Sequence, residues 1–338
     1  MSMIDYQVYA PYHWEDLRKL FERVWGSSRS VEYDQKHWNN TIIGTAPGIV
    51  ALAGDRIVGF YTVWPVPLTD GAKVVIGGQP IDSMVDGQFQ GRGLLRELGR
   101  RCYQECARHS IAVMYGAPNR AALAGNLGGL NWSHVSEIVD YVRPVLRQAR
   151  RSGFLANLMD QDRAIKGLTV SATPSALDTA AVFYANVAAQ GDAKKVWRLA
   201  QSTEWVRYRY GSTPEVRYLT LMIGQGDKIR GAAVCGIRFK NALDGPVVKL
   251  TISELVGRDN AACREVIGGI VSLAAACGAP YVQAKSAGAG LGSVLLSAGF
   301  LPYRRTPLIS RTLDASCHRA NPLAKSGWAL FGGAFDTI

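Results

Sequence analysis

The stretch IDSMVDGQFQGRGLLREL, residues 81–98, joins a strand-like run to a helix-like run through a turn rich in glycine. Gln88, Gly91 and Gly93 give this turn the pattern Q-x-x-G-x-G. The first amides of a helix lack partners and lie at the positive end of the helix dipole, which suits a pyrophosphate. Glycine lets the backbone approach an anion and adopt positive φ, and Arg92 adds a permanent positive charge. The turn therefore predicts a site for a phosphate-bearing ligand.

Strands and helices alternate on both sides of this turn, which indicates a mixed α/β fold. The expected elements of the first half are a strand (3–9), a helix (13–25), a hairpin around a Gly-Asp turn (48–68), a strand (74–85), a helix (94–109), a strand (111–119), a short helix that reaches 132 and a strand (133–145).

The second half repeats this outline more loosely. Its expected elements are two strands (230–239 and 247–257), a helix (260–278), a strand (280–286) and a helix that ends in Gly-aromatic (289–300). A duplication at domain scale is the simplest account. We therefore expect one domain over 1–145, a polar and basic connecting segment over 146–168, and a second domain over 169–338.

A dinucleotide-binding fold also combines glycines with a helix start. Its glycine-rich turn follows the first strand, however, and an acidic residue ends the second strand about 20 residues later. Here the turn follows a hairpin-rich set of strands, and the next strand ends in Pro118-Asn119. The order of the elements disfavours the dinucleotide interpretation.

The composition suits a globular chain without a membrane partner. The chain has 338 residues, of which 48% are hydrophobic. Its apolar runs are shorter than the roughly 18 residues that span a bilayer, and residues 1–17 do not resemble a secretory signal. We therefore expect a cytoplasmic protein with two domains.

The cysteines are scattered and predict neither disulfides nor a metal site. Cys102, Cys106 and His109 share one face of the expected helix, but a metal would need a further ligand from elsewhere. Small apolar core residues are the better interpretation, and no metal is expected. All six cysteines are interpreted in this way: Cys102, Cys106, Cys235, Cys263, Cys277 and Cys317.

The net charge of +11 suits an anionic partner. Nucleic acid, a membrane surface and a phosphate-rich small molecule all fit such a charge. The arginines gather in two groups, over 92–108 and 143–151, which are equally typical of solvated helix faces.

The turn QFQGRG after a strand resembles the acyl-coenzyme A signature of the GNAT (Gcn5-related N-acetyltransferase) superfamily. YGAPNRAALAGNLGGLNW, residues 115–132, is similar to the next strand and helix of that superfamily. The second copy has LVGRDNAACRE where the turn would be, which implies a degenerate domain without coenzyme. Such a tandem resembles acyltransferases that modify amino sugars in nucleotide-sugar pathways, and GWALFGGAFDTI at the C-terminus resembles their last strand.

The resemblance implies a coenzyme site around the turn, with acetyl- or another short acyl-coenzyme A as co-substrate. The backbone of Met84 and Val85 would hold the pantetheine, and one amide there would polarise the thioester carbonyl. Asn119 would bind the coenzyme arm. The coenzyme-binding residues of the turn itself would be Gln88, Phe89, Gln90, Gly91, Arg92, Gly93 and Leu94.

The implied reaction is direct attack of a neutral amine on the thioester. Asp82 is the candidate base, although a strand aspartate that faces solvent or caps the turn is an alternative. Tyr115 is the candidate acid, although a core tyrosine is an alternative. The superfamily often has a tyrosine on the following helix, and residues 120–132 contain none.

Residues for the acceptor are predicted in the second half. The segment 203–218 is dense in aromatic residues and arginines, which can stack on a sugar or base and bind a diphosphate. Glu254 lies on the strand that corresponds to the one with Asp82. The alternatives are packing for the aromatic residues and solvent exposure for the charges. The candidates are Trp205, Arg207, Arg209, Tyr210 and Glu254.

The sequence therefore predicts an N-acyltransferase that acts on a small amine, most simply an amino sugar, free or nucleotide-linked. One alternative is an aminoacyl transferase of FemABX type, whose donor is charged tRNA; the intact Q-x-x-G-x-G argues against it. Another is a non-catalytic nucleic-acid-binding module, for which the sequence has no zinc or helix-turn-helix pattern.

Overall fold

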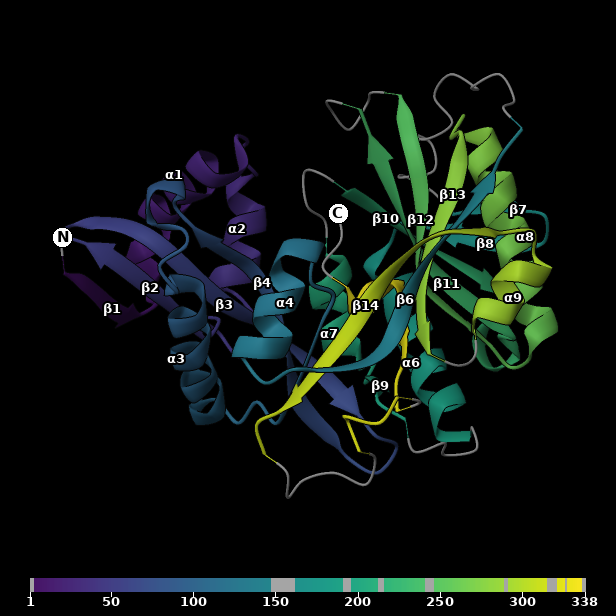
Figure 1. Ribbon diagram of the computed structural model, residues 1–338. Helices are drawn as coiled ribbons and strands as arrows, with labels where there is room; N and C mark the ends of the chain where they lie inside the picture. Colours follow the sequence, from purple (N-terminus) through teal and green to yellow (C-terminus); the bar gives the residue numbers. More distant parts are fainter. Residues whose placement is uncertain are drawn as a thin grey trace. The chain divides into compact units, whose positions relative to one another are not determined.

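The computed structural model describes residues 3–146, 162–190, 196–211, 216–240, 246–288, 291–314, 321–325 and 327–335 (Figure 1). The chain divides into two compact units. Unit 1 consists of Met1–Ser136 with Pro307–Gly327, and unit 2 of Glu137–Thr306 with Trp328–Ile338. The expected connecting segment lies largely outside the described residues.

Unit 1 is a mixed sheet with helices on both faces. Its strands follow the order β1-β2-β3-β4-β5-β14, in which only the β4–β5 pair is parallel. Its elements are β1 (Ile4–Val8), η1 (Pro11–His13), α1 (Trp14–Trp25), α2 (Val31–Trp38), β2 (Gly48–Ala53), β3 (Arg56–Thr69), β4 (Val74–Val85), η2 (Gly87–Phe89), α3 (Leu94–Arg108), β5 (Val113–Gly116), α4 (Arg120–Gly129) and the start of β6 (Ser133–Pro144).

Alternate residues of the unit 1 strands pack on opposite faces of the sheet. On one face Val58 and Val63 of β3 pack with Leu98 and Cys102 of α3. On the other face Ile57 and Phe60 pack with residues of α1 and α2: Leu17, Leu20 and Trp38. β3 therefore presents a hydrophobic layer to each side of the sheet, although a β-bulge at Val58 interrupts its period of two.

Unit 2 repeats this arrangement. Its strands follow the order β6-β13-β12-β11-β10-β8-β7, again with one parallel pair, β12–β13. Its elements are the rest of β6, β7 (Arg163–Ile165), β8 (Leu168–Ser171), α6 (Pro174–Gln190), β9 (Arg198–Leu199), α7 (Thr203–Tyr210), β10 (Val216–Ile223), η3 (Gly226–Lys228), β11 (Gly231–Phe239), β12 (Val247–Gly257), α8 (Asn260–Ala276), β13 (Tyr281–Gly288), α9 (Leu291–Ser297), the start of β14 (Leu301–Thr312), β15 (Ala329–Phe331) and η5 (Gly332–Ala334).

The two units exchange a strand. β6 follows α4 in the chain, yet its residues 138–144 pair with β13 of unit 2. β14 follows α9, yet its residues 309–312 pair with β5 of unit 1. Residues 307–327, which the sequence boundaries assign to the second domain, therefore belong to unit 1.

The cysteines serve as core residues. Cys102 and Cys106 of α3 are fully buried, while His109 lies beside Glu105, with Nε2 at 3.4 Å from Oε1. Cys235, Cys263 and Cys277 are buried in unit 2. Cys317 lies outside the described residues.

Candidate acyl-coenzyme A site

The glycine-rich turn is an open backbone loop at the start of a helix. Gly91 and Gly93 have φ of +74° and +76°, which glycine adopts without strain. A Cβ added to either would meet none of the described atoms within 4 Å. Glu97 N donates to Gly93 O at 3.1 Å, so the three amides before Glu97 precede the first hydrogen bond of α3. The turn therefore offers amides to an anion in open space.

Asp86 fixes the entry to the turn. It is buried, and its carboxylate accepts hydrogen bonds from Gln88 N at 3.2 Å, from Arg23 Nε at 3.0 Å and from Arg56. Burial alone would raise the pKa of Asp86, but these hydrogen bonds outweigh it and lower the pKa. Asp86 thus remains ionised and anchors the loop next to the helix.

Arg92 is exposed on the loop and lies over its own turn. Its guanidinium donates to Gln88 O at 2.9 Å and lies 5.3 Å from the centre of the Phe89 ring. The charge is therefore held beside the open amides. An anion bound there would gain a charge-assisted contact from it.

The parallel strands β4 and β5 part before the turn. Their pairing in the described structure consists of Gly77 with Val113 and Gly78 with Met114. Tyr115 and the next residue of β5 pair only with β14, on the other side. Where this pairing ends, β4 leaves a slot beside β5. A pantetheine arm is expected to lie in this slot.

The backbone of Val85 faces this slot. Asp86 N donates to Val58 O at 2.9 Å, and backbone groups alternate sides along an antiparallel strand. The N–H and C=O of Val85 therefore turn away from β3, and Gln90 Nε2 donates to this carbonyl at 3.0 Å. The amide of Val85 is thus available to a thioester.

The side chains of Met84, Val85 and Leu94 are buried in the core of unit 1. Only their backbone can contact a coenzyme. The backbone role that the sequence predicts for them stays a prediction.

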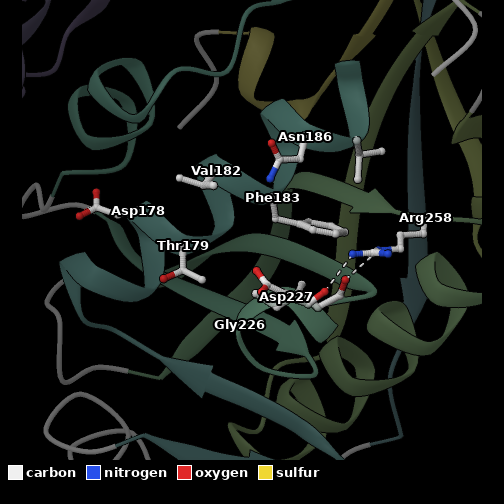
Figure 2. Close-up of a pocket in the computed structure, with 10 residues that line it drawn as sticks. Asp178, Thr179, Val182, Phe183, Asn186, Gly226, Asp227 and Arg258 are labelled. Carbon is white, nitrogen blue, oxygen red and sulfur yellow. Dashed lines mark hydrogen bonds between the residues drawn. The ribbon is translucent and has the colours of Figure 1, made fainter. Parts of the chain in front are cut away.

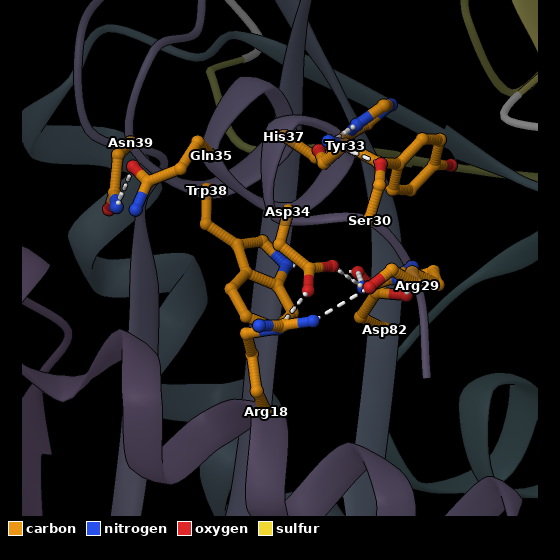
Figure 3. Close-up of polar contacts among 10 residues, drawn as sticks. All are labelled: Arg18, Arg29, Ser30, Tyr33, Asp34, Gln35, His37, Trp38, Asn39 and Asp82. Carbon is orange, nitrogen blue, oxygen red and sulfur yellow. Dashed lines mark hydrogen bonds and ion pairs between the residues drawn. The ribbon is translucent and has the colours of Figure 1, made fainter. Parts of the chain in front are cut away.

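Asp82 lies at a β-bulge of β4. Between the pairs Phe60–Met84 and Thr62–Ile81, β4 has one more residue than β3, and Asp82 has a φ of +48°. Its carboxylate oxygens accept from both terminal nitrogens of Arg29, at 2.9 Å each, and from Trp38 Nε1 at 2.9 Å (Figure 3). Asp82 is therefore held in an ion pair rather than exposed to solvent.

Tyr115 and Asn119 differ sharply in exposure. Tyr115 is fully buried in β5, which favours the core interpretation over a general acid. Asn119 is exposed at the N-cap of α4, where its side chain accepts from Ala122 N at 2.9 Å.

Comparison with known proteins now identifies unit 1. The sequence model of the family described as "Acetyltransferase (GNAT) domain" matches residues 5–134. These residues form a GNAT acetyltransferase domain. The GNAT domain contains the whole of the turn, the parted strands and the bulge. No curated protein matches the sequence of the chain.

Solved structures share the fold over nearly the whole chain. A GCN5-related N-acetyltransferase from Anabaena variabilis has a TM-score of 0.63 at 14% identity, over 92% of this chain and 73% of that one. A conserved protein of Enterococcus faecalis has a TM-score of 0.63 at 11% identity, over 93% and 73%. A GCN5-related N-acetyltransferase from Kribbella flavida has a TM-score of 0.59 at 14% identity, over 93% and 72%. At these identities the likeness shows a common fold.

The GNAT domain identifies the chain as an acyl-coenzyme A-dependent acyltransferase. The turn, with its amides in open space, and the parted strands fit the phosphates and the pantetheine arm of that coenzyme. Within the described part of the chain, no helix is both long and apolar enough to cross a membrane.

The candidate acceptor residues lie outside the GNAT domain, on α7 and β12. Trp205, Tyr210 and Glu254 are buried. Arg209 is also buried, and its guanidinium donates to Gly333 O at 3.2 Å and Phe335 O at 3.1 Å.

Arg207 differs from the other acceptor candidates because its side chain is exposed. It forms a bidentate ion pair with Asp178, with two contacts of 2.6 Å. Such an exposed pair contributes little to stability. Of the five candidates, Arg207 is therefore the one whose side chain reaches solvent.

Glu254 is the centre of a buried polar cluster. Tyr210 Oη and Gln201 Nε2 both donate to its carboxylate. Burial raises the pKa of Glu254 to about 7, although the hydrogen bond from Tyr210, the charge of Arg209 and the hydrogen bond from Gln201 all act in the opposite direction. The cluster brings Tyr210 and Glu254 together and leaves Arg207 apart.

A pocket of about 420 Å³ also lies in unit 2 (Figure 2). Phe183 and Asp178 of α6 line it, together with Asp227 and Arg258. Arg258 Nε donates to Ile229 O at 3.0 Å, and its terminal nitrogen donates to Asp227 O at 3.1 Å. The pocket includes none of the predicted site residues, so we do not assign the reaction to it.

The sequence interpretation missed the charged residues that hold the turn and the bulge. Arg23, Arg29 and Arg56 are distant in the sequence from the aspartates that they bind, and no spacing pattern marks them. Asp86 had a signal: an aspartate just before a turn is a common cap of a helix start.

Proposed function

We propose that the chain transfers an acetyl or other short acyl group from acyl-coenzyme A to the amino group of a small acceptor, an amino sugar, free or nucleotide-linked. The open turn is the observation that supports acyl-coenzyme A as the donor. Gly91 and Gly93, with positive φ and open space around them, follow β4, which parts from its parallel neighbour β5.

The donor is held by backbone groups in this proposal. The amides from Phe89 to Leu94 bind the pyrophosphate, Arg92 adds charge, and the slot beside β5 takes the pantetheine. The amide of Val85 then donates to the thioester oxygen as that oxygen gains charge. Asn119 contacts the coenzyme arm from the start of α4.

The acyl transfer itself is a direct displacement. The nitrogen of the neutral amine attacks the thioester carbon, the tetrahedral oxyanion collapses, and the thiolate of coenzyme A leaves and takes up a proton. A base or a chain of water molecules removes the proton from the amine. Asp82 is the carboxylate on β4, the strand that leads into the turn, but three hydrogen bonds occupy most of its accepting capacity.

The acceptor part of the proposal has a separate basis. It follows from the resemblance to tandem acyltransferases that modify amino sugars, together with the repeated strand order of the two units. Arg207, the exposed acceptor candidate, would bind a phosphate or hydroxyl of the acceptor after release from Asp178.

Isothermal calorimetry with acetyl-coenzyme A tests the donor site. We expect Gly91→Asp to weaken binding by about 100-fold or more, because the new carboxylate lies beside the pyrophosphate and the left-handed backbone disfavours it. Gly167→Asp is the matched control: Gly167 has a φ of +79°, has open space, and lies in the β7–β8 turn of unit 2. Full affinity in the Gly91 variant would refute the proposed cradle.

Thiol release from acetyl-coenzyme A with a panel of amines tests the acceptor. Amino sugars and their nucleotide conjugates are expected to turn over faster than amino acids or polyamines. The alternative outcome is that the chain binds charged tRNA, with an affinity that falls steeply as salt rises, and does not bind acetyl-coenzyme A. The net charge of +11 would then bind a polyanion, and the chain would be an aminoacyl transferase.

A further inference from the structure

We propose that Arg29 is a positioning residue for acyl transfer. Its ion pair with Asp82 holds the bulge of β4 so that the amide of Val85 points at the thioester oxygen. The inference rests on the proposed function, since it assigns this amide to the thioester.

The bulge of β4 requires contacts from outside the strand to keep its conformation. Asp82 has a φ of +48°, in the left-handed region that side chains rarely adopt, and it lies where β4 has one residue too many for β3. A conformation of this kind persists only where its surroundings fix it. Arg29 and Trp38 supply three hydrogen bonds to the Asp82 carboxylate, so they fix the bulge from outside the strand.

The guanidinium of Arg29 is itself set in place. A terminal nitrogen contacts Asp34 at 2.8 Å, and Arg18 binds both Asp34, at 3.0 Å, and the carbonyl of Arg29, at 2.7 Å (Figure 3).

Aromatic rings enclose the same guanidinium. The centres of Phe21, Tyr33 and Trp38 lie 4.1, 4.8 and 5.4 Å from its central carbon. Because few rotamers of Arg29 satisfy both the rings and the two carboxylates, the position of Asp82 follows from the fold of α1 and α2.

A second ion pair holds the other end of the same segment. Asp86, directly after β4, binds Arg23 of α1 and Arg56 of β3. Val85 therefore lies on a short stretch of backbone that arginine–aspartate pairs fix on both sides, at the bulge and at the turn. A small displacement of an oxyanion donor strongly reduces its stabilisation of the transition state. Holding Val85 in place is therefore expected to affect the rate of acyl transfer.

This inference gives Asp82 a role other than general base. As a base it would have to accept the proton of the amine while bound to Arg29, and only 10% of its side chain is exposed. As a partner of Arg29 it need not change its protonation state. The two roles predict different results when Asp82 becomes asparagine.

The test uses Arg29→Lys and Asp82→Asn in the full chain. Lysine keeps the charge but loses the bidentate geometry, and asparagine tolerates a left-handed φ. The primary readout is the infrared carbonyl band of bound [1-13C]acetyl-coenzyme A, which needs no acceptor. We expect the wild type to shift this band to lower wavenumber, and both variants to lose about half of the shift or more.

Kinetics with the best amine of the panel provide the second readout. Both variants are expected to lower kcat by about 10- to 100-fold, with the KM for acetyl-coenzyme A changed less than about 3-fold, because the pyrophosphate turn is unaffected. The acidic limb of the kcat/KM profile should remain at the same pH in Asp82→Asn. Arg230→Lys is the control: one terminal nitrogen of Arg230 contacts both carboxylate oxygens of Glu265 on the surface of unit 2, and its replacement should leave the band and kcat unchanged.

The outcomes separate this inference from the proposed function. If the wild type fails to bind acetyl-coenzyme A, the proposed function fails. If it binds and reacts while both variants keep the wild-type band and kcat, only the role of Arg29 is wrong. If Asp82→Asn removes the acidic limb, Asp82 is the base and the positioning role is overturned. Thermal unfolding checks that each variant is folded. If Arg29→Lys does not fold, the results for Asp82→Asn alone decide whether the ion pair has the positioning role.

Discussion

At the scale of single residues, Glu254 makes the stability of the protein depend on pH. Burial raises its pKa from the ordinary value of 4.5 to about 7. Between these two values the folded protein keeps a proton that the unfolded chain has lost, so the free energy of unfolding falls as pH rises. The loss is on the order of 3 kcal/mol by pH 8. We expect Glu254→Gln to abolish this slope, as measured by urea unfolding at pH 5, 6, 7 and 8.

Glu265→Gln provides the comparison, because its carboxylate is 43% exposed and forms a surface pair with Arg230. That variant should retain the slope of the wild type. An unchanged slope in Glu254→Gln would show that the buried carboxylate is ionised throughout, stabilised by Tyr210 and Gln201.

The sequence predicted residues whose role depends on local backbone, and it failed for those whose role depends on distant partners. Gly91 and Gly93 could be assigned to a turn because glycine and a following helix are adjacent in the chain. Arg29 could not be assigned to Asp82, because their contact requires α1, α2 and β4 to be folded first. Glu254 likewise gave no sign that Tyr210 would cover it.

At the scale of elements, the two units differ beside their parallel strands. In unit 1, β4 leaves a slot beside β5. In unit 2, other segments of the chain fill the corresponding slot beside β13. The β12–β13 pairing ends at Ile252 and Ala284, and β15 then pairs with Ser286–Gly288 of β13 on that same side. The following turn η5 lies against β12 so closely that a Cβ on Gly332 would be 2.6 Å from Ile252 O. The space for a second coenzyme arm is thus taken by protein.

We therefore expect one acetyl-coenzyme A per chain. Calorimetry should give a single site, and the Gly91→Asp variant should show no site of wild-type affinity. A second independent site in that variant would mean that β15 and η5 leave the slot on binding.

Periodicity predicted the amphipathic helices well and missed others, among them α2 and α6. α1, α3 and α8 have apolar residues at helical spacing and appear where the pattern indicates them. α2 carries polar residues on its buried side, among them Asp34 and His37, so it has no apolar stripe to detect. Both residues are buried against other segments: Asp34 binds Arg18 of α1, and the ring of His37 lies 5.3 Å from the ring of Trp64 of β3.

At the scale of the whole molecule, the exchanged strands decide which part of the chain can fold alone. The sequence pattern favoured a boundary near residue 145, because each copy reads as complete up to its last strand. The pattern carries no information on which sheet that strand joins. Residues 309–312 pair with β5, and residues 138–144 pair with β13.

A fragment of residues 1–145 should therefore fail to fold cooperatively. It lacks β14, so β5 becomes an exposed edge, and its own residues 138–144 lose their partner strand. We expect broad, non-cooperative urea unfolding by circular dichroism and no binding of acetyl-coenzyme A, although the fragment contains the whole match to the GNAT family. Co-expression with residues 146–338 should restore both properties, because it returns each strand to its sheet. Cooperative unfolding and full affinity in the isolated fragment would show that the exchange is dispensable for the GNAT domain.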